Sequence, residues 1–289
     1  EFDSDSPTIW KPIDVSGLTP GTNGTYLDFK ASDNLGNDAF GGTDWTGVGL
    51  AADDQCLDSP TNNFCTLNPL DVVASSITFA HGNTQAFWAS TAAWRSTFGT
   101  MAPSSGKWYY EVIGGNSSGH LHAAIVSPEY AALLGPTLEI STTNAQPSYS
   151  IYGANGSIYY SNTSGAGNSS SYAGGDPHNT HTDYIGCYFD LDNNKLYFAK
   201  NGTVLASGTG FDIEAGFAYM PGFSLYNQTA AGTGVNFGNG NFLGTAISGT
   251  TYNDANGYGI FKYDPSAGTF DGGSKEFLAL CTKNLAEYG

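Results

Sequence analysis

The feature that most constrains the fold is a strand–turn–strand pattern at residues 183–202, DYIGCYFDLDNNKLYFAKNG. Apolar and aromatic residues dominate both flanks, and Asp192-Asn193-Asn194 separates them. Asp and Asn favour tight turns because their side chains bond nearby backbone groups and tolerate left-handed dihedral angles. The pattern therefore predicts a β-hairpin, followed by a second turn at Asn201-Gly202.

The same stretch also resembles the opening of a calcium loop that begins at Asp190. An EF-hand loop requires Gly at its sixth position and a bidentate Glu at its twelfth. Lys195 and Asn201 occupy these positions here, and the flanks have the pattern of strands rather than helices. We therefore interpret the acidic segment as a hairpin turn and not as a metal site.

Similar short strands recur along most of the chain, with turn residues between them. The predicted strands are residues 76–79, 107–113, 120–126, 148–152, 184–191, 195–200, 222–225 and 234–237. Residues 107–113 carry apolar groups on both alternating faces, which is typical of a strand inside a two-layer sandwich or under a covering loop. Helical spacing occurs only near residues 128–134 and 275–280. The chain is thus predicted to be an all-β antiparallel sandwich.

The density of strand and turn patterns along the sequence divides the chain into three parts. Residues 1–75 form a loop-rich extension expected to pack on the sandwich, with one strand at 24–29; residues 76–245 form the sandwich; and residues 246–289 form a C-terminal extension with a short helix. The polar segment 161–182 is predicted to be a long loop at one end of the sandwich.

The charge balance excludes some partners. The chain has 9 Lys and Arg against 26 Asp and Glu, which gives a net charge of −17. This field repels nucleic-acid phosphates and anionic membranes, so we expect neither as a partner. We find no apolar run long enough for membrane insertion and no signal peptide at the start of the sequence. An acidic, Lys-poor surface is compatible with a saline or extracellular setting.

The four cysteines do not form a C-x-x-C pair, so a zinc site is not expected. Cys187 lies within a strand pattern and is predicted to be a core residue. Cys56 and Cys65 lie in one loop-rich region, where they could form a disulfide in an oxidising compartment or remain free thiols.

Motifs for catalysis are missing from the sequence. It contains no H-E-x-x-H, no phosphate-binding loop and no dinucleotide fingerprint. Carboxylates that could cleave a glycosidic bond exist, but no spacing places two of them across a cleft. They are Glu111, Glu129, Glu139 and Glu214. We therefore expect a protein that is not an enzyme and needs no cofactor.

Possible ligand contacts are concentrated in the loops. Asp176, His178, His181 and Asp183 could hold a transition metal, although a plain polar loop is the favoured interpretation. His120 and His122 share one face of a strand and are expected to be surface or hydrogen-bonded core residues.

Aromatic residues next to Asn, Asp and Gly could form a platform for sugars or peptides, or could equally cover the ends of the core. These rings are Trp88, Trp94, Tyr130, Tyr159, Tyr160 and Tyr172. The candidate ligand-binding residues are accordingly Tyr172, Asp176, His178, His181, Tyr130 and Trp88; no metal-binding or catalytic residue is predicted.

Five ordered segments resemble the SPRY domain, a bent, jelly-roll-type β-sandwich of the concanavalin-A-like class. They are SGKWYYEV at 105–112, YSIYGANG at 149–156, DYIGCYFD at 183–190, LYF with NG at 196–202, and a closing group of Pro221, Ser224-Leu225 and Asn236-Phe237-Gly238. The resemblance implies this fold and a partner bound by loops. The loop at 161–182 departs from the family pattern, so the resemblance does not identify a ligand.

The outer segments resemble sequences that flank SPRY domains in tail fibres and other virion proteins of tailed viruses. The segments are 22–29, 35–38, 58–64, 66–70 and 277–285. This resemblance implies a non-enzymatic protein on a virion surface, outside the cell, that binds a host-surface glycan or protein and forms a homo-oligomer. Two alternatives remain: a capsid-decorating or fibre-building subunit whose partners are virion proteins, and a polysaccharide-cleaving enzyme.

Overall fold

The fold was analysed in a computed structural model of the 289-residue chain. The structure describes residues 13–70, 77–88, 93–114, 120–133, 139–140, 146–169, 172–173, 183–226 and 232–289. The chain separates into two compact units, Glu1–Asn63 and Phe64–Gly289. The second unit thus includes the residues of the predicted C-terminal extension.

The described residues of the first unit, 13–63, consist of turns and irregular segments, with one short 3-10 helix at Ala52–Asp54 (η1). The strand predicted at 24–29 is wrong. The backbone N–H of Tyr26 donates to Asp38 Oδ1 at 3.0 Å, and Phe29 has a left-handed φ of 55°. The Tyr26 N–H thus donates its hydrogen bond to a side chain, and no strand among the described residues pairs with this segment. Large apolar side chains stay exposed in this unit, including Trp45 at 60% and Val48 at 89%.

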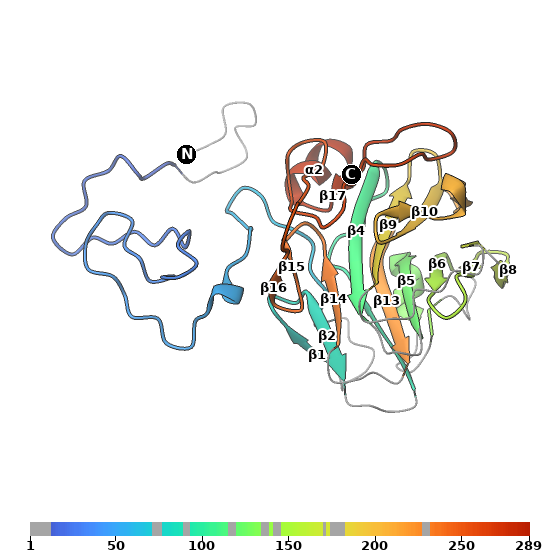
Figure 1. The fold of residues 1–289 in the computed structure, drawn as a ribbon, viewed down its shortest axis with the longest axis horizontal. Helices are drawn as coiled ribbons and strands as arrows, with labels where there is room; N and C mark the ends of the chain where they lie inside the picture. Colours follow the sequence, from blue (N-terminus) through green and yellow to red (C-terminus); the bar gives the residue numbers. More distant parts are fainter. Residues whose placement is uncertain are drawn as a thin grey trace. The chain divides into compact units, whose positions relative to one another are not determined.

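The second unit is a β-sandwich whose two sheets carry the strands drawn in Figure 1. The described strands of the larger sheet follow the order β1 (Ile77–Ala80), β2 (Gln85–Trp88), β14 (Thr233–Asn236), β4 (Lys107–Gly114), β9 (Tyr184–Asp190), β10 (Lys195–Lys200) and β11 (Thr203–Val204), with β12 (Phe211–Asp212) beside β10 and β17 (Leu278–Ala279) beside β4. The smaller sheet follows the order β3 (Trp94–Phe98), β13 (Met220–Tyr226), β5 (Leu121–Val126), β6 (Ser148–Tyr152), β7 (Ile158–Asn162) and β8 (Gly165–Ser169). All these pairings are antiparallel except that of β17 with β4.

Smaller elements complete the second unit. They are the pair β15 (Asn241–Phe242) and β16 (Thr245–Ala246), the short 3-10 helix η2 (Ala206–Gly208), and the helices α1 (Pro128–Leu133) and α2 (Thr282–Tyr288). None of the described helices is long and apolar enough to cross a membrane. The all-β antiparallel sandwich predicted from the strand pattern is confirmed.

The main core lies between the two sheets. On β4, Trp108, Tyr110 and Val112 point inward, and Ala123 and Ile125 of β5 face them from the smaller sheet. Each is buried completely or almost completely. Burial of a large apolar side chain stabilises a fold by about 1.5–3 kcal/mol, so period-2 alternation is sufficient to fix which face of each strand points inward.

The hairpin predicted from residues 183–202 is confirmed. β9 and β10 pair antiparallel with Asp190 opposite Lys195, and Asn194 takes a left-handed φ of 54° in the turn. The buried Asp190 carboxylate accepts hydrogen bonds from the backbone and side chain of Asn193 at 2.9–3.0 Å. Lys275 Nζ also contacts it, at 2.7 Å. The second predicted turn, at Asn201, is confirmed as well.

Two sequence-based expectations are corrected. The predicted loop 161–182 contains β8, which pairs with β7; residues 170–171 and 174–182 lie outside the described residues. The first predicted helix is confirmed as α1, but the second, at 275–280, is wrong because Leu278 pairs with Trp108 in β17. β14 pairs only with residues 111–114 of β4, which leaves the edge near Trp108 free for β17.

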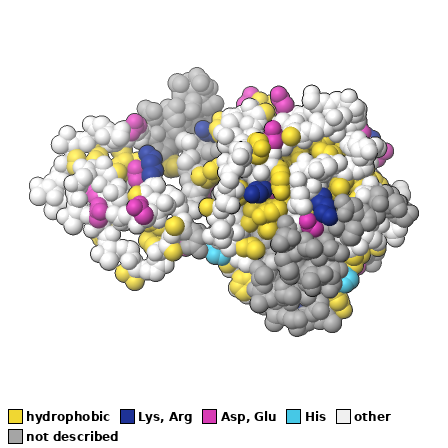
Figure 2. Space-filling model, in the orientation of Figure 1, with side chains coloured by type: hydrophobic (Ala, Val, Ile, Leu, Met, Phe, Trp, Pro, Cys, Tyr) yellow, Lys and Arg dark blue, Asp and Glu magenta, His cyan; other side chains and the backbone are white. Residues whose placement is uncertain are grey.

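The C-terminal extension covers the outer face of the larger sheet. Tyr188 and Tyr197 of that face pack against Phe270 and Phe277 of the extension, and Tyr109 packs against Phe261. All six rings are buried. Figure 2 shows the space-filled molecule with its charged side chains scattered among uncharged ones on the visible face.

Candidate functional site

The outer face of the smaller sheet carries a group of aromatic and imidazole rings. We define the ring cluster as Trp94, His120, His122, Tyr152, Tyr159 and Tyr226. These residues come from β3, the start of β5, β6, β7 and β13. The register places Trp94 opposite Tyr226 and His122 opposite Tyr152, so alternation along each strand directs the rings to one face.

The rings pack against one another around His122. The His122 ring stacks on Tyr152, with centroids 4.7 Å apart and an interplanar angle of 15°. The Trp94 ring meets the His122 ring edge-on, with centroids 5.1 Å apart, and lies tilted against the Tyr226 ring at 5.5 Å. His122 is fully buried, whereas Trp94, Tyr152, Tyr226 and the other two rings are only half-buried. The cluster is therefore a packed platform whose outer rings remain accessible.

Hydrogen bonds fix the orientation of the imidazoles. His122 Nδ1 lies 2.8 Å from Ser150 Oγ, and Nε2 lies 2.6 Å from Glu139 Oε1. His120 Nδ1 lies 2.6 Å from the Tyr152 hydroxyl. Burial lowers the pKa of His122, against the opposing effect of Glu139, and burial raises the pKa of Tyr152. The platform thus combines aromatic rings, a buried imidazole whose charged form burial disfavours, and the Glu139 side chain at its edge.

The other end of the same face is closed by α1. Tyr130 of α1 is completely buried and packs in a cluster with Phe98, Val126 and Met220. Of the two interpretations left open for this ring, the structure thus places it in the core rather than on a free surface. The Tyr130 side chain lies on the side of α1 that packs against the sheet, so its ring is part of the core.

The other predicted ligand residues are not brought together within the described part of the chain. Tyr172 is half-buried; its hydroxyl donates to the Thr209 carbonyl at 2.8 Å, and its ring packs edge-on against Phe198. Trp88 ends β2, opposite Ile77, and only its backbone is described. Asp176, His178 and His181 lie outside the described residues. Within the described ranges, no group of three His, Cys, Asp or Glu residues could hold a metal ion.

The suggested Cys56–Cys65 disulfide is not formed in the structure, where all four cysteines are free thiols. Cys65 belongs to the second unit and is fully buried there, with its Sγ 3.7 Å from Thr100 Oγ1, whereas Cys56 is exposed in the first unit. Burial raises the pKa of the Cys65 thiol to about 11. Cys187 is a core residue, as predicted.

The four glutamates considered for glycoside cleavage lie in separate environments. Glu111 is buried under the C-terminal extension, where it accepts hydrogen bonds from Tyr109, Asn236, Lys262 and Tyr263 at 2.8–3.0 Å. Its burial raises its pKa to about 7. Glu139 contacts His122, Glu214 contacts Thr163, and Glu129 is exposed on α1. Each of the four carboxylates thus lies in a different local environment.

Sequence reasoning found part of the ring cluster. Trp94 and Tyr159 stood out as rings near turns, and His120 and His122 as neighbours on one strand face. Tyr152 and Tyr226 were missed, although each occupies the last position of a strand, where a ring can remain partly exposed. No pattern in the sequence predicted the contact between the Glu139 carboxylate and the His122 ring.

Comparison with known proteins identifies the second unit. The SPRY domain model matches residues 88–240, which is more than half of the chain. No curated protein matches the chain significantly. Among solved structures, the PSpry domain of TRIM65 is similar at 15% identity and a TM-score of 0.42, covering 60% of this chain and 89% of that one. The SPRY domain of human HERC1 is similar at 14% identity and a TM-score of 0.42, covering 58% of this chain and 94% of that one. With its sandwich fold and the ordered SPRY match, this chain belongs to the SPRY domain family.

Proposed function

We propose that this chain is a non-enzymatic binding protein and that the ring cluster is the surface on which its ligand binds. SPRY domains are protein-interaction modules, which supports a binding role. The observation that carries the proposal is the set of half-buried rings around the buried His122. Aromatic rings offer a large contact area with little conformational entropy to lose, and their polar edges supply hydrogen bonds.

The proposed ligand is a glycan or protein on a host surface, and the proposed location is the outside of a virion. The resemblance of the outer segments to flanking segments of tail-fibre proteins supports this setting, as does the strongly acidic composition. Sugars and peptides both suit a ring platform with a carboxylate at its edge, because apolar faces pack on the rings and hydroxyl or amide groups bond the polar atoms. Nucleic acid and membrane insertion are not part of the proposal.

Trp94→Ala in the full chain tests the proposal. Glycan arrays and adsorption to host cells should show at least tenfold weaker binding than the unmodified chain, because Trp94 touches four other rings of the cluster. Trp45→Ala is the matched control, since Trp45 is an exposed tryptophan of the first unit. Unchanged binding by Trp94→Ala, or an equal loss in both variants, would contradict the proposed surface.

A second candidate function is assembly with copies of the same chain or with other virion proteins. The observation that favours it is the exposure of apolar side chains in the first unit, such as Phe29, Trp45, Val48 and Leu50. Exposed apolar groups in this number are typical of a surface that is covered in an assembly. Replacing Val48 and Leu50 by Ser should lower the oligomeric mass measured by light scattering. A monomeric unmodified chain would contradict self-assembly.

A further inference from the structure

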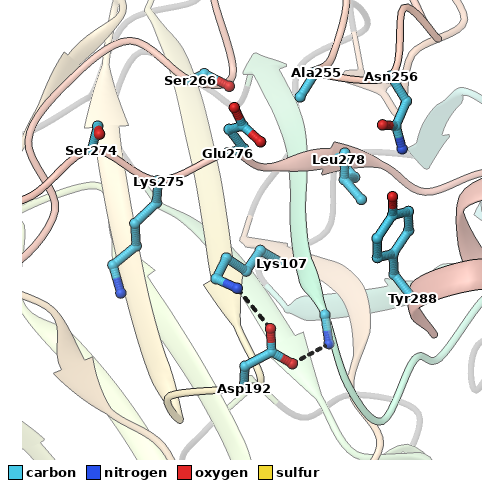
Figure 3. A pocket seen from close by; sticks show the side chains of 11 residues that line it. Lys107, Asp192, Ala255, Asn256, Ser266, Ser274, Lys275, Glu276, Leu278 and Tyr288 are labelled. Carbon is cyan, nitrogen blue, oxygen red and sulfur yellow. Dashed lines mark hydrogen bonds and ion pairs between the residues drawn. The ribbon is translucent and has the colours of Figure 1, made fainter.

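A polar cavity lies away from the ring cluster, where the C-terminal extension meets the start of β4. It is an open hollow with a volume of about 570 Å³, lined by Lys107 of β4, Asp192 of the β9–β10 turn, Ser274 and Glu276 of the extension, and Tyr288 at the end of α2 (Figure 3). Cavities of a few hundred to about 1,000 Å³ are the usual size of small-ligand sites. Four separate parts of the chain thus form one hollow of ligand size.

Both lysines that line this cavity form ion pairs with aspartates. Lys107 Nζ lies 2.7 Å from Asp192 Oδ2, and Asp192 Oδ1 accepts a hydrogen bond from the Gly106 N–H at 2.7 Å. Lys275 Nζ lies 2.7 Å from the buried Asp190 and 5.4 Å above the Tyr197 ring. In Figure 3 the Lys275 amine points away from Glu276 and Tyr288. Because both ammonium groups are neutralised by carboxylates, the cavity is poorly suited to an anion.

Several polar groups of the lining have no partner among the described residues. They include the hydroxyls of Ser266, Ser274 and Tyr288 and the carboxylate of Glu276, none of which is hydrogen-bonded. The side chain of Leu278 adds an apolar patch to the same lining. The three hydroxyls both donate and accept hydrogen bonds, and the carboxylate accepts them.

We propose that this cavity binds a neutral, polyhydroxylated small ligand, of the class of a single sugar unit. Such a ligand carries hydroxyls that donate to Glu276 and exchange hydrogen bonds with Ser266, Ser274 and Tyr288. Its C–H faces pack on Leu278 and the Tyr288 ring. The glutamate and the net charge of −17 disfavour phosphates and carboxylates. This inference is independent of the ring cluster.

The test is a titration of the full chain with glucose, galactose, mannose and N-acetylglucosamine, followed by saturation-transfer NMR. At least one of these sugars should bind saturably. We expect a Kd on the order of 1 mM, because the ligand forms only a few hydrogen bonds in an open site. The double variant Ser274→Ala/Glu276→Ala should weaken this binding at least tenfold. Both side chains are exposed and unpartnered, so its melting temperature should match that of the unmodified chain.

Two controls separate this cavity from other sugar-binding surfaces. Glu129→Ala removes an exposed glutamate far along the sequence, on α1, and should bind as the unmodified chain does. Trp94→Ala should also bind these sugars normally, because it changes only the ring cluster; a loss there would assign the sugar to the ring cluster and overturn the cavity proposal. Absence of saturable binding by all four sugars, or full binding by the double variant, would likewise overturn it.

Discussion

The two outer faces of the sandwich have similar residues but different surroundings. On the larger sheet, Tyr109, Tyr188 and Tyr197 lie under the C-terminal extension and are buried. On the smaller sheet, Trp94 and Tyr226 belong to a ring cluster that remains half-buried. We call these the covered face and the ring-cluster face. The same aromatic chemistry stabilises the fold where the chain covers it and is available to a ligand where it stays accessible.

The polar groups of the two faces differ in the same way. The covered face holds Glu111, which is fully buried and accepts four hydrogen bonds, two of them from backbone N–H groups of the extension. The ring-cluster face holds His122, whose carboxylate partner Glu139 is partly exposed. Burial disfavours the charged form of both groups, so the two faces should respond to pH in opposite directions.

The largest expected effect is on the covered face. Phe277→Ala should lower the free energy of unfolding by about 3–5 kcal/mol, the usual cost of truncating a buried phenylalanine. Its ring is completely buried against Phe270, at 5.0 Å between centroids, and Tyr188, at 5.1 Å. Chemical denaturation measures the change, with the exposed Leu133→Ala as the control, for which we expect a change within about 0.5 kcal/mol. Equal stabilities for both variants would show that the extension does not stabilise the covered face.

Glu111 should give the next largest effect. Its pKa is raised by burial from 4.5 to about 7, so the folded chain holds a proton that the unfolded chain releases. The stabilisation is complete below pH 4.5 and is lost as the pH rises through about 7, a decrease on the order of 3 kcal/mol.

Urea denaturation from pH 5 to 8 measures this decrease. Glu111→Gln removes the titration, so its profile should be flatter in this window, although the variant is less stable because an amide nitrogen cannot accept a hydrogen bond. Parallel profiles for the two proteins would contradict the role assigned to Glu111.

Trp94→Ala should change stability less than Phe277→Ala does. The Trp94 ring is only half-buried, so we expect a loss of about 1–2 kcal/mol in the free energy of unfolding. Thermal denaturation measures this value beside the ligand-binding assay. A loss as large as that of Phe277→Ala would mean that the ring cluster is a second core and not an accessible platform.

The smallest effect should come from His122. Burial lowers its pKa, so the unfolded chain binds a proton that the folded chain does not. Its stabilisation is present above pH 6.5 and is lost as the pH falls, and the nearby Glu139 reduces the effect. His122→Gln should therefore flatten the acid side of the stability profile, as followed by urea denaturation between pH 4.5 and 7. An unchanged slope would show that the pKa of His122 is the same in the folded and the unfolded chain.

The sequence predicted strands that are rich in apolar and aromatic residues and bounded by turn residues. Residues 148–152 and 195–200 form strands with the predicted bounds, and the turn between Asp190 and Lys195 follows from its Asp and Asn residues. β8 was missed because it lacks such residues. β8, with the sequence GAGNS, is a strand because β7 offers it an edge and not because its residues favour one.

The sequence of this protein by itself determined the two-layer fold, because period-2 burial and turn chemistry act between near neighbours in the chain. Only the tertiary structure decided which rings are covered. Tyr109 and Trp94 are both aromatic residues on outer faces, and their surroundings depend on residues more than a hundred positions away, such as Phe261 beside Tyr109 and Tyr226 beside Trp94. Contacts between such distant residues leave no local pattern, so the candidate site appears only when the strands are assembled.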